Sequence, residues 1–245
     1  MTPSAPAATS ATPAETEPVQ RPWRGVAPDD RRAERRSILL ATAFELLGTD
    51  GWRGTTVRRV CEASRLNPRY FYESFDGLES LLLAVFDELM GEVTALTTAT
   101  LAVADGTPRA QAKAIVSSLI RFVTDDPRRA RILFVEALGE ERMGRHRLDT
   151  LHATAQVIDG YTRRQWGGPA EPDRTTMVAA HLFMGGLSEL VIAWLDNKLE
   201  GTLDELIDDT AALMVSVMGS AADRTRTGSP STTSLPSVGG GSPPR

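Results

Sequence analysis

The sequence predicts an all-α protein of about nine helices, in which a three-helix N-terminal helix-turn-helix domain precedes a longer helical domain. Apolar residues recur at helical spacing along most of the chain, and the alternation typical of strands is almost absent. Capping residues and Gly or Pro breaks separate these periodic segments. At 245 residues the chain is long enough for one or two domains with a substantial core.

The two ends of the chain differ in composition from the rest. Residues 1–28 are rich in Ala, Pro, Thr and Glu, and residues 220–245 are rich in Ser, Thr, Gly and Pro. Neither segment has enough apolar side chains to offset the entropy lost on ordering, so we expect both to be disordered tails. Between them the pattern predicts the helix-turn-helix domain at 29–76 and the second helical domain at 77–219.

Four helices are expected in the first part of the chain. The first covers about 29–48, with Gly48 and Gly51 bracketing its end, and Thr55 or Thr56 caps a second at 57–64. Asn67 and Pro68 are a start signal for a short third helix that reaches residue 75.

The fourth helix is expected to run from Asp76, its predicted cap, to about residue 104. Glu79 lies three residues after this cap, a spacing that resembles a capping box. Five more helices follow from Gly and Pro breaks and apolar spacing. They are expected at about 108–124, 127–139, 142–166, 172–199 and 203–218.

Charge is distributed unevenly along the chain. The formal net charge is −5, yet residues 21–72 contain eleven Arg and six acidic residues, a balance of +5 that leaves −10 for the rest. A basic head on an acidic body is typical of a protein that binds phosphates with one end, although a solvated surface of mixed charge would look the same.

The lone Cys61 excludes an internal disulfide and a cysteine zinc site. With no run of about 18 apolar residues and no signal-peptide pattern, we expect a cytoplasmic protein without a membrane segment.

Two short helices separated by residues 64–67 have the spacing of a helix-turn-helix, whose second helix enters the DNA major groove. Residues 36–82 resemble, without a gap, the DNA-binding domain of the TetR family of transcription regulators. The matching positions are Arg36, Leu39, Leu40, Ala43, Leu47, Gly51, Thr55, Thr56, Val57, Val60, Leu66, Asn67, Phe71, Tyr72, Phe75, Glu79, Leu81 and Leu82. Segments 126–131 and 186–190 are similar to stretches frequent in actinobacterial members.

Residue types and positions suggest which side chains contact DNA. Arg69 and Tyr70 lie on the first turn of the third helix, and Arg69 is the expected base reader because Arg pairs bidentately with guanine. Thr55 and Thr56 lie at a helix N-terminus that favours phosphate, although plain capping would also explain them. The resemblance implies that Tyr72 contacts phosphate. The predicted DNA-binding residues are Thr55, Thr56, Arg58, Asn67, Arg69, Tyr70 and Tyr72.

The chain departs from the family pattern at three positions. Arg65 replaces the usual turn glycine, which costs roughly 1 kcal/mol if the backbone there is left-handed. Leu78 stands where the family often has a phosphate-binding Lys, and Tyr70 replaces a common Thr or Ser. We therefore expect an operator that differs from those of well-matched relatives. Arg31, Arg32, Arg35 and Arg36 are placed to reach the flanking DNA backbone or to form a solvated charge run.

The second domain contains bulky or adaptable apolar residues on neighbouring helices, with a few polar groups among them, as ligand pockets do. The predicted lining residues are Phe122, Phe134, Met143, His152, Met177, His181 and Met184. An ordinary packed core with two satisfied histidines would explain the same residues. The resemblance implies that domain 77–219 binds an unknown small apolar ligand, which releases the protein from DNA.

The last two helices are amphipathic, and two such helices per subunit can form a four-helix bundle with a twofold mate. The predicted dimer-interface residues are Leu187, Val191, Trp194, Leu206 and Leu213. The resemblance also implies a homodimer.

Taken together, the sequence and the resemblance predict a homodimeric, ligand-responsive repressor that binds a double-stranded DNA operator and uses no cofactor or metal. Repression rather than activation follows from the family alone. An enzyme is disfavoured because the chain lacks His-Glu-x-x-His, Gly-x-Ser-x-Gly, Gly-x-Gly-x-x-Gly and phosphate-loop motifs. The alternative is a helical protein-interaction or dimerisation module without ligand response, which would not need Arg69 and Tyr70 exposed on a short helix.

Overall fold

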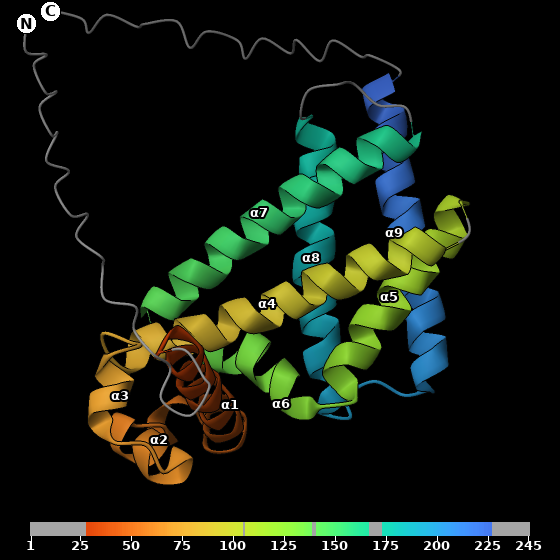
Figure 1. Cartoon of the computed structure of the whole chain (residues 1–245). Coiled ribbons are helices and arrows are strands. Elements are labelled where there is room, and N and C mark those ends of the chain that lie inside the picture. Colours follow the sequence, from red (N-terminus) through yellow and green to blue (C-terminus); the bar gives the residue numbers. More distant parts are fainter. Residues whose placement is uncertain (1–27, 105, 139–140, 167–172, 227–245) are drawn as a thin grey trace, which may run out of the picture.

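The computed structural model describes residues 28–226 apart from 105, 139–140 and 167–172. Within these residues the chain forms nine α-helices and no strand, which confirms the all-α prediction. The helices are α1 (Pro28–Gly54), α2 (Val57–Ser64), α3 (Pro68–Tyr72), α4 (Leu78–Val103), α5 (Pro108–Thr124), α6 (Pro127–Ala130), α7 (Glu141–Trp166), α8 (Arg174–Leu195) and α9 (Leu203–Arg226). Figure 1 shows α1–α3 gathered where α4 begins, while α5 and α9 lie at its far end. The predicted N-terminal tail, apart from Pro28, and residues 227–245 of the predicted C-terminal tail lie outside the described residues.

The first three helices pack around a common apolar cluster. Leu39, Ala43 and Leu47 occupy one face of α1 and meet Val60 of α2 and Phe71 of α3. Each of these five side chains is at most 1% exposed. Burial of a large apolar side chain contributes about 1.5–3 kcal/mol, so this cluster stabilises α2 and α3, which are too short to be stable alone.

Both short helices begin at caps that the sequence predicts. The Thr56 hydroxyl accepts the N–H of Arg59 at 3.2 Å, and the Asn67 side chain accepts the N–H of Arg69 at 2.9 Å. Between the helices Arg65 adopts a left-handed conformation, with φ 56° and ψ 29°. The turn therefore has the left-handed backbone expected at this position, and having arginine there rather than glycine costs about 1 kcal/mol of stability.

The first helix breaks at the second of the two glycines predicted to bracket its end, and not at Gly48. Helical backbone continues past Gly48 to Gly51, whose φ of 73° breaks the regular geometry before a last turn reaches Gly54. Gly48 serves close packing instead, because a Cβ there would lie 2.5 Å from the Cβ of Arg128 on α6. Glycine at 48 thus lets α1 and α6 approach each other closely.

The start of the fourth helix also differs from the prediction. Ser80, rather than Glu79, completes the N-terminal turn, since its hydroxyl accepts the N–H of Gly77 at 3.3 Å and donates to the carbonyl of Gly77 at 2.9 Å. Glu79 faces Arg142 of α7 at 3.2 Å. Its carboxylate is used in a contact between helices, and such contacts are not visible in local spacing.

The segment predicted as one helix at 127–139 is divided into three short pieces. Helix α6 is followed by a π-helical turn, η2 (Arg131–Val135), and by a 3₁₀ turn, η3 (Glu136–Leu138). π-Helical turns are rare and often occur at functional sites. This irregular segment lies between α1 and the second domain, so it connects the two parts of the molecule (Figure 1).

Helix α8 is, among the described residues, the one helix long and apolar enough to cross a membrane by length and composition. It packs against both α7 and α9 and contributes to a second apolar cluster (Figure 1). These contacts give one physical reason for its apolar composition. The buried residues of this cluster are Ala112, Val116, Ile120, Ala155, Ala179, Ala180, Ile207, Ala211, Met214, Met218 and Ala221.

Helix α9 extends to Arg226, beyond the predicted end at residue 218. Ala221 and Ala222 are 5% and 0% exposed, so the helical domain reaches past 219 and the first residues assigned to the C-terminal tail are part of it. Gly219 does not stop the helix, because packing of α9 on α5 and α7 outweighs the roughly 1 kcal/mol that a helical glycine costs.

Truncation at two positions tests whether the helical domain ends at residue 219, as predicted from the sequence, or at Arg226, as in the structure. Removing 227–245 should leave the melting temperature within about 1 °C of the full chain, whereas removing 220–245 should lower stability by about 1–3 kcal/mol, or several degrees, because two buried alanines are lost. Thermal unfolding followed by circular dichroism measures both. Equal melting temperatures for the two truncations would contradict the extended domain.

Candidate nucleic-acid interface and apolar cavity

The surface formed by α2 and α3 carries exposed cationic side chains. Arg58 and Arg69 are 86% and 82% exposed, and each contacts an acid one turn later, Glu62 at 2.7 Å and Glu73 at 3.0 Å. Exposed ion pairs of this kind are weak, because water screens the two charges. Either guanidinium can therefore exchange its carboxylate for a phosphate or a base edge at small cost.

Arginines of α1 fix the end of α3. Arg32 donates to the carbonyl of Glu73 at 2.5 Å, and Arg36 donates to the carbonyl of Ser74 at 3.2 Å. These carbonyls are acceptors that a helix end leaves without intrahelical partners. Two of the arginines considered for flanking DNA thus orient the short helix that presents Arg69.

The tyrosines of α3 differ in exposure. Tyr72 is 61% exposed, and its ring edge meets Phe71. Tyr70 is 37% exposed, and the guanidinium of Arg35 lies 4.4 Å from the centre of its ring. Arg35 thus restricts the orientation of the Tyr70 ring, which remains partly exposed.

The two threonines before α2 have different roles. Thr55 is 2% exposed and its hydroxyl donates to the carbonyl of Gly51 at 2.8 Å, so the prediction that its side chain contacts DNA is wrong. The hydroxyl instead stabilises the turn that ends α1. The other predicted residues lie on the exposed surface of α2 and α3. They are Thr56, Arg58, Asn67, Arg69, Tyr70 and Tyr72.

A cavity of about 90 Å³ lies in the second domain, between α4, α5, η2, α7 and α8. Its wall is almost wholly apolar and includes three of the predicted residues, Phe122, Phe134 and Met184. Leu187 and Val191 also line it, although the sequence predicted them at a dimer interface. Val191 is 2% exposed, so its side chain is directed into its own subunit.

Four residues predicted to line the cavity lie elsewhere. Met143 is 2% exposed within the first apolar cluster, and Met177 packs on the second cluster. His152 and His181 are exposed and contact each other, with Nδ1 of His152 3.3 Å from Nε2 of His181. Helical spacing places these residues on α7 and α8 correctly but does not show which face meets the cavity.

Arg147 of α7 is a cavity residue that the sequence did not reveal. Burial lowers the pKa of its guanidinium, because the charged form loses hydration. Arg147 lies one turn after Met143 and one turn before Leu151, both apolar, and this spacing is the signal that could have placed it on an inward face. A cation in a largely apolar wall is costly unless a ligand or partner compensates it.

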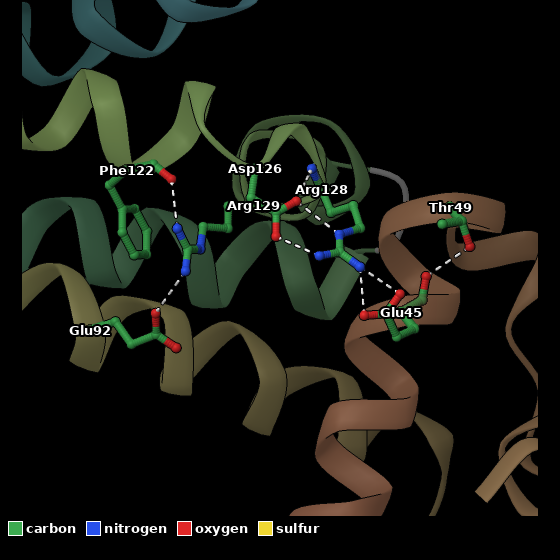
Figure 2. Close-up of polar contacts among 7 residues, drawn as sticks. All are labelled: Glu45, Thr49, Glu92, Phe122, Asp126, Arg128 and Arg129. Atoms are coloured by element: carbon green, nitrogen blue, oxygen red, sulfur yellow. Dashed lines mark hydrogen bonds and ion pairs between the residues drawn. The ribbon is translucent and has the colours of Figure 1, made fainter.

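Two arginines join α6 to its neighbours. Figure 2 shows Arg128 between Asp126, at 2.7 Å, and Glu45 of α1, at 2.5 Å. In the same figure Arg129 donates to the carbonyl of Phe122, at 3.1 Å, and faces Glu92 of α4. Because Phe122 lines the cavity, these contacts connect the cavity wall to the first helix.

A second set of contacts joins the irregular segment to the end of α1. Arg131 donates to the carbonyl of Thr49 at 2.6 Å and to the carboxylate of Glu136 at 2.9 Å. Glu136 in turn accepts the backbone N–H of Trp52 at 2.7 Å. The turn after Gly51 is therefore held by side chains of η2 and η3.

Comparison with known proteins agrees with this geometry. Residues 39–85 match the family model described as bacterial regulatory proteins, tetR family. Residues 39–85 are a TetR-family DNA-binding domain. The matched description is that of regulatory proteins, which agrees with the expectation that the chain is not an enzyme. No curated protein sequence matches the chain.

Solved structures of transcriptional regulators share the fold of about three quarters of this chain. The fatty acid degradation regulator FadR from Bacillus halodurans is 17% identical, with a TM-score of 0.63 over 76% of this chain and 95% of that one. FadR from Bacillus subtilis, in complex with stearoyl-CoA, is 17% identical, with a TM-score of 0.64 over 74% and 98%. A TetR-family regulator from Marinobacter aquaeolei VT8 is 18% identical, with a TM-score of 0.55 over 77% and 97%.

The junction at α6 predicts a specific acid sensitivity. The Arg128 side chain lowers the pKa of Asp126 by hydrogen bonding, so the stabilisation is complete above the unfolded carboxyl pKa of about 3.9 and is lost as pH falls through the lower folded value. Asp126→Asn should therefore be less stable than the wild type in urea at pH 7, and this difference should shrink towards pH 3.

Asp125→Asn is the matched control, since this adjacent side chain is exposed. It should give little change in stability at either pH. A stability loss for Asp126→Asn that stays constant between pH 7 and pH 3 would contradict a role for its ionised carboxylate.

Proposed function

We propose that this chain is a homodimeric transcriptional repressor of the TetR type, which binds a double-stranded operator and is released from it by an apolar ligand. The observation that carries the proposal is the exposed, cationic surface of α2 and α3 within a TetR-family domain. The contacts of Arg32 and Arg36 support it, because they fix α3 in one orientation. A positioned recognition helix loses less freedom on binding DNA than a mobile one.

In this proposal α3 enters the major groove, and a twofold mate places a second copy about 34–36 Å away. Arg69 reads a guanine through its two parallel donors, while Arg58, Tyr70 and Tyr72 contact neighbouring bases or phosphates. The N-termini of α2 and α3, capped by Thr56 and Asn67, add backbone N–H groups that favour phosphate.

Exposed apolar side chains on the last two helices support dimerisation. Leu182 of α8 is 67% exposed and Leu213 of α9 is 65% exposed, and neither has a reason within one subunit to face water. Gly185 and Gly186 lie on the exposed part of α8, and a Cβ added to either would meet no atom within 4 Å. Glycines in mid-helix cost stability, and a closely packed partner helix would offset that cost.

The contacts around α6 supply a physical route from ligand to DNA. A ligand that displaces Phe122 or Phe134 moves the segment that carries Arg128 and Arg129, and Arg128 binds Glu45 of α1. A shift of α1 changes the separation of the two recognition helices. Couplings of this kind are typically 1–3 kcal/mol, enough to lower operator affinity by roughly 5- to 150-fold.

Three further features support the apolar ligand, the type of regulator and the cellular location in the proposal. The FadR structure with stearoyl-CoA is an example of this fold binding a ligand with a long apolar part. Segments 126–131 and 186–190 support an actinobacterial type of regulator. A role on chromosomal DNA, together with a single buried cysteine, suits the cytoplasm.

DNA binding is tested with fragments selected from random DNA by the full chain. Arg69→Ala should weaken binding to the selected site by about 1–3 kcal/mol and relax the preference at one base pair, because a bidentate contact is lost. Fluorescence anisotropy and a repeated selection measure the two effects. The control is Arg145→Ala, which removes an equal charge from an exposed position on α7. Unchanged affinity and selectivity for Arg69→Ala would refute its assigned role.

Dimerisation is tested by placing a charge on the exposed apolar surface. Leu182→Glu or Leu213→Glu should produce folded monomers that bind the operator at least tenfold more weakly, because a buried charge opposes the interface. Val103→Glu is the control, since Val103 is 85% exposed at the end of α4. Light scattering gives the mass. A monomeric wild-type protein at micromolar concentration would exclude the proposed dimer.

A further inference from the structure

The cavity contains one ionisable side chain whose charge nothing else in the wall balances. Arg147 lines the cavity, and none of the lining residues is acidic. Among the residues that the structure describes, no hydrogen bond, ion pair or ring contact is formed by its guanidinium. Other arginines of this domain show the contrast, since Arg121 and Arg163 each contact a carboxylate within 3 Å.

The two hydroxyl groups that line the cavity both donate their hydrogen to backbone carbonyls, so neither can donate a hydrogen bond to a ligand. Thr150 donates to the carbonyl of His146 at 2.9 Å, and Ser188 donates to the carbonyl of Met184 at 3.0 Å. The guanidinium of Arg147 therefore supplies the N–H groups that remain for a guest among these lining side chains. Any polar atom of the guest that meets Arg147 must accept hydrogen bonds, and a negative charge is the best acceptor.

We infer that the cavity binds an apolar monocarboxylic acid, whose chain fills the cavity and whose carboxylate pairs with Arg147. This inference rests on the proposed ligand-responsive function and specifies the chemical class of the ligand. A planar carboxylate matches the two parallel donors of a guanidinium, and the low polarity of the wall strengthens the pair. A neutral guest of the same shape leaves the charge of Arg147 uncompensated.

The size of the cavity limits the apolar part of the ligand. A volume of about 90 Å³ is below the roughly 150 Å³ of a cavity that holds benzene, so a short or branched chain fits directly. Longer chains need displacement of wall residues. Met90 and Met184 are suited to this, because unbranched thioether side chains adapt to different shapes.

The experiment measures binding to the full chain by calorimetry with a series of straight-chain acids from butanoate to decanoate. Each acid is compared with its methyl ester and with the alcohol of equal length. At least one acid should bind about tenfold to a hundredfold more tightly than its ester and alcohol, as expected for hydrogen bonds to a charged group. Arg147→Met should remove this difference and leave the affinity for the alcohol within about twofold.

The control variant is Arg145→Met, two residues earlier and exposed, which should bind the acids as the wild type does. Thermal unfolding without ligand separates a binding role from a structural one. Arg147→Met should melt no lower than the wild type, since it removes a charge that pairs with none of the described residues, and a clear loss of stability would overturn the inference.

The other outcomes are also distinct. Equal binding of acids, esters and alcohols would overturn the carboxylate inference and leave an apolar ligand in place. Binding of octanoyl-coenzyme A without binding of any free acid would assign the anionic contact to phosphate groups and overturn it too. If no compound binds, the cavity has no ligand of this class, while operator binding, measured separately, still decides the DNA-binding part of the proposed function.

Discussion

The close contact between α1 and α6 is the constraint on which the arrangement of the two domains depends. Gly48 allows it, because any side chain there would collide with Arg128, and the Arg128–Glu45 ion pair fixes its register. The contact has two consequences. It places η2 and η3 where Arg131 and Glu136 hold the end of α1, and it aligns α1 so that its arginines reach the end of α3. The orientation of α3 is thus set partly from outside the helix-turn-helix.

Charge has separate uses in the two parts of the molecule. In the first domain the cationic groups of α2 and α3 are exposed and weakly paired, so they can exchange partners with DNA. Around α6 the arginines are engaged with carboxylates and carbonyls on neighbouring elements, which makes them structural links (Figure 2). Arg147 fits neither group, because it lies in an apolar wall and pairs with no residue in the part of the chain that the structure describes. Sequence composition reports the basic head but cannot distinguish these three uses.

The sequence predicted most of the fold because the deciding interactions are local. Thr56 and Asn67 cap helices through bonds to residues two or three positions away, and such bonds follow from spacing alone. The failures have a common cause in tertiary contacts. Gly48 looked like a helix end but permits close packing, and Thr55 looked exposed but is buried beneath α1. His152 and His181 lie on predicted helices, yet the face that meets the cavity depends on helix orientation, which spacing does not give.

The size of the expected allosteric effect fits the few contacts available to carry it. A coupling of 1–3 kcal/mol is no larger than the loss of one or two hydrogen bonds that involve a charged group, each worth about 1.5–3 kcal/mol. The Arg129–Phe122 contact is of this kind, and the more exposed Arg128–Glu45 pair follows it between the cavity wall and α1. The domain therefore need not repack when a ligand enters. In the proposed function, rearrangement of either contact, at the irregular segment where α6 gives way to π-helical backbone, would shift α1 and so weaken binding to the operator.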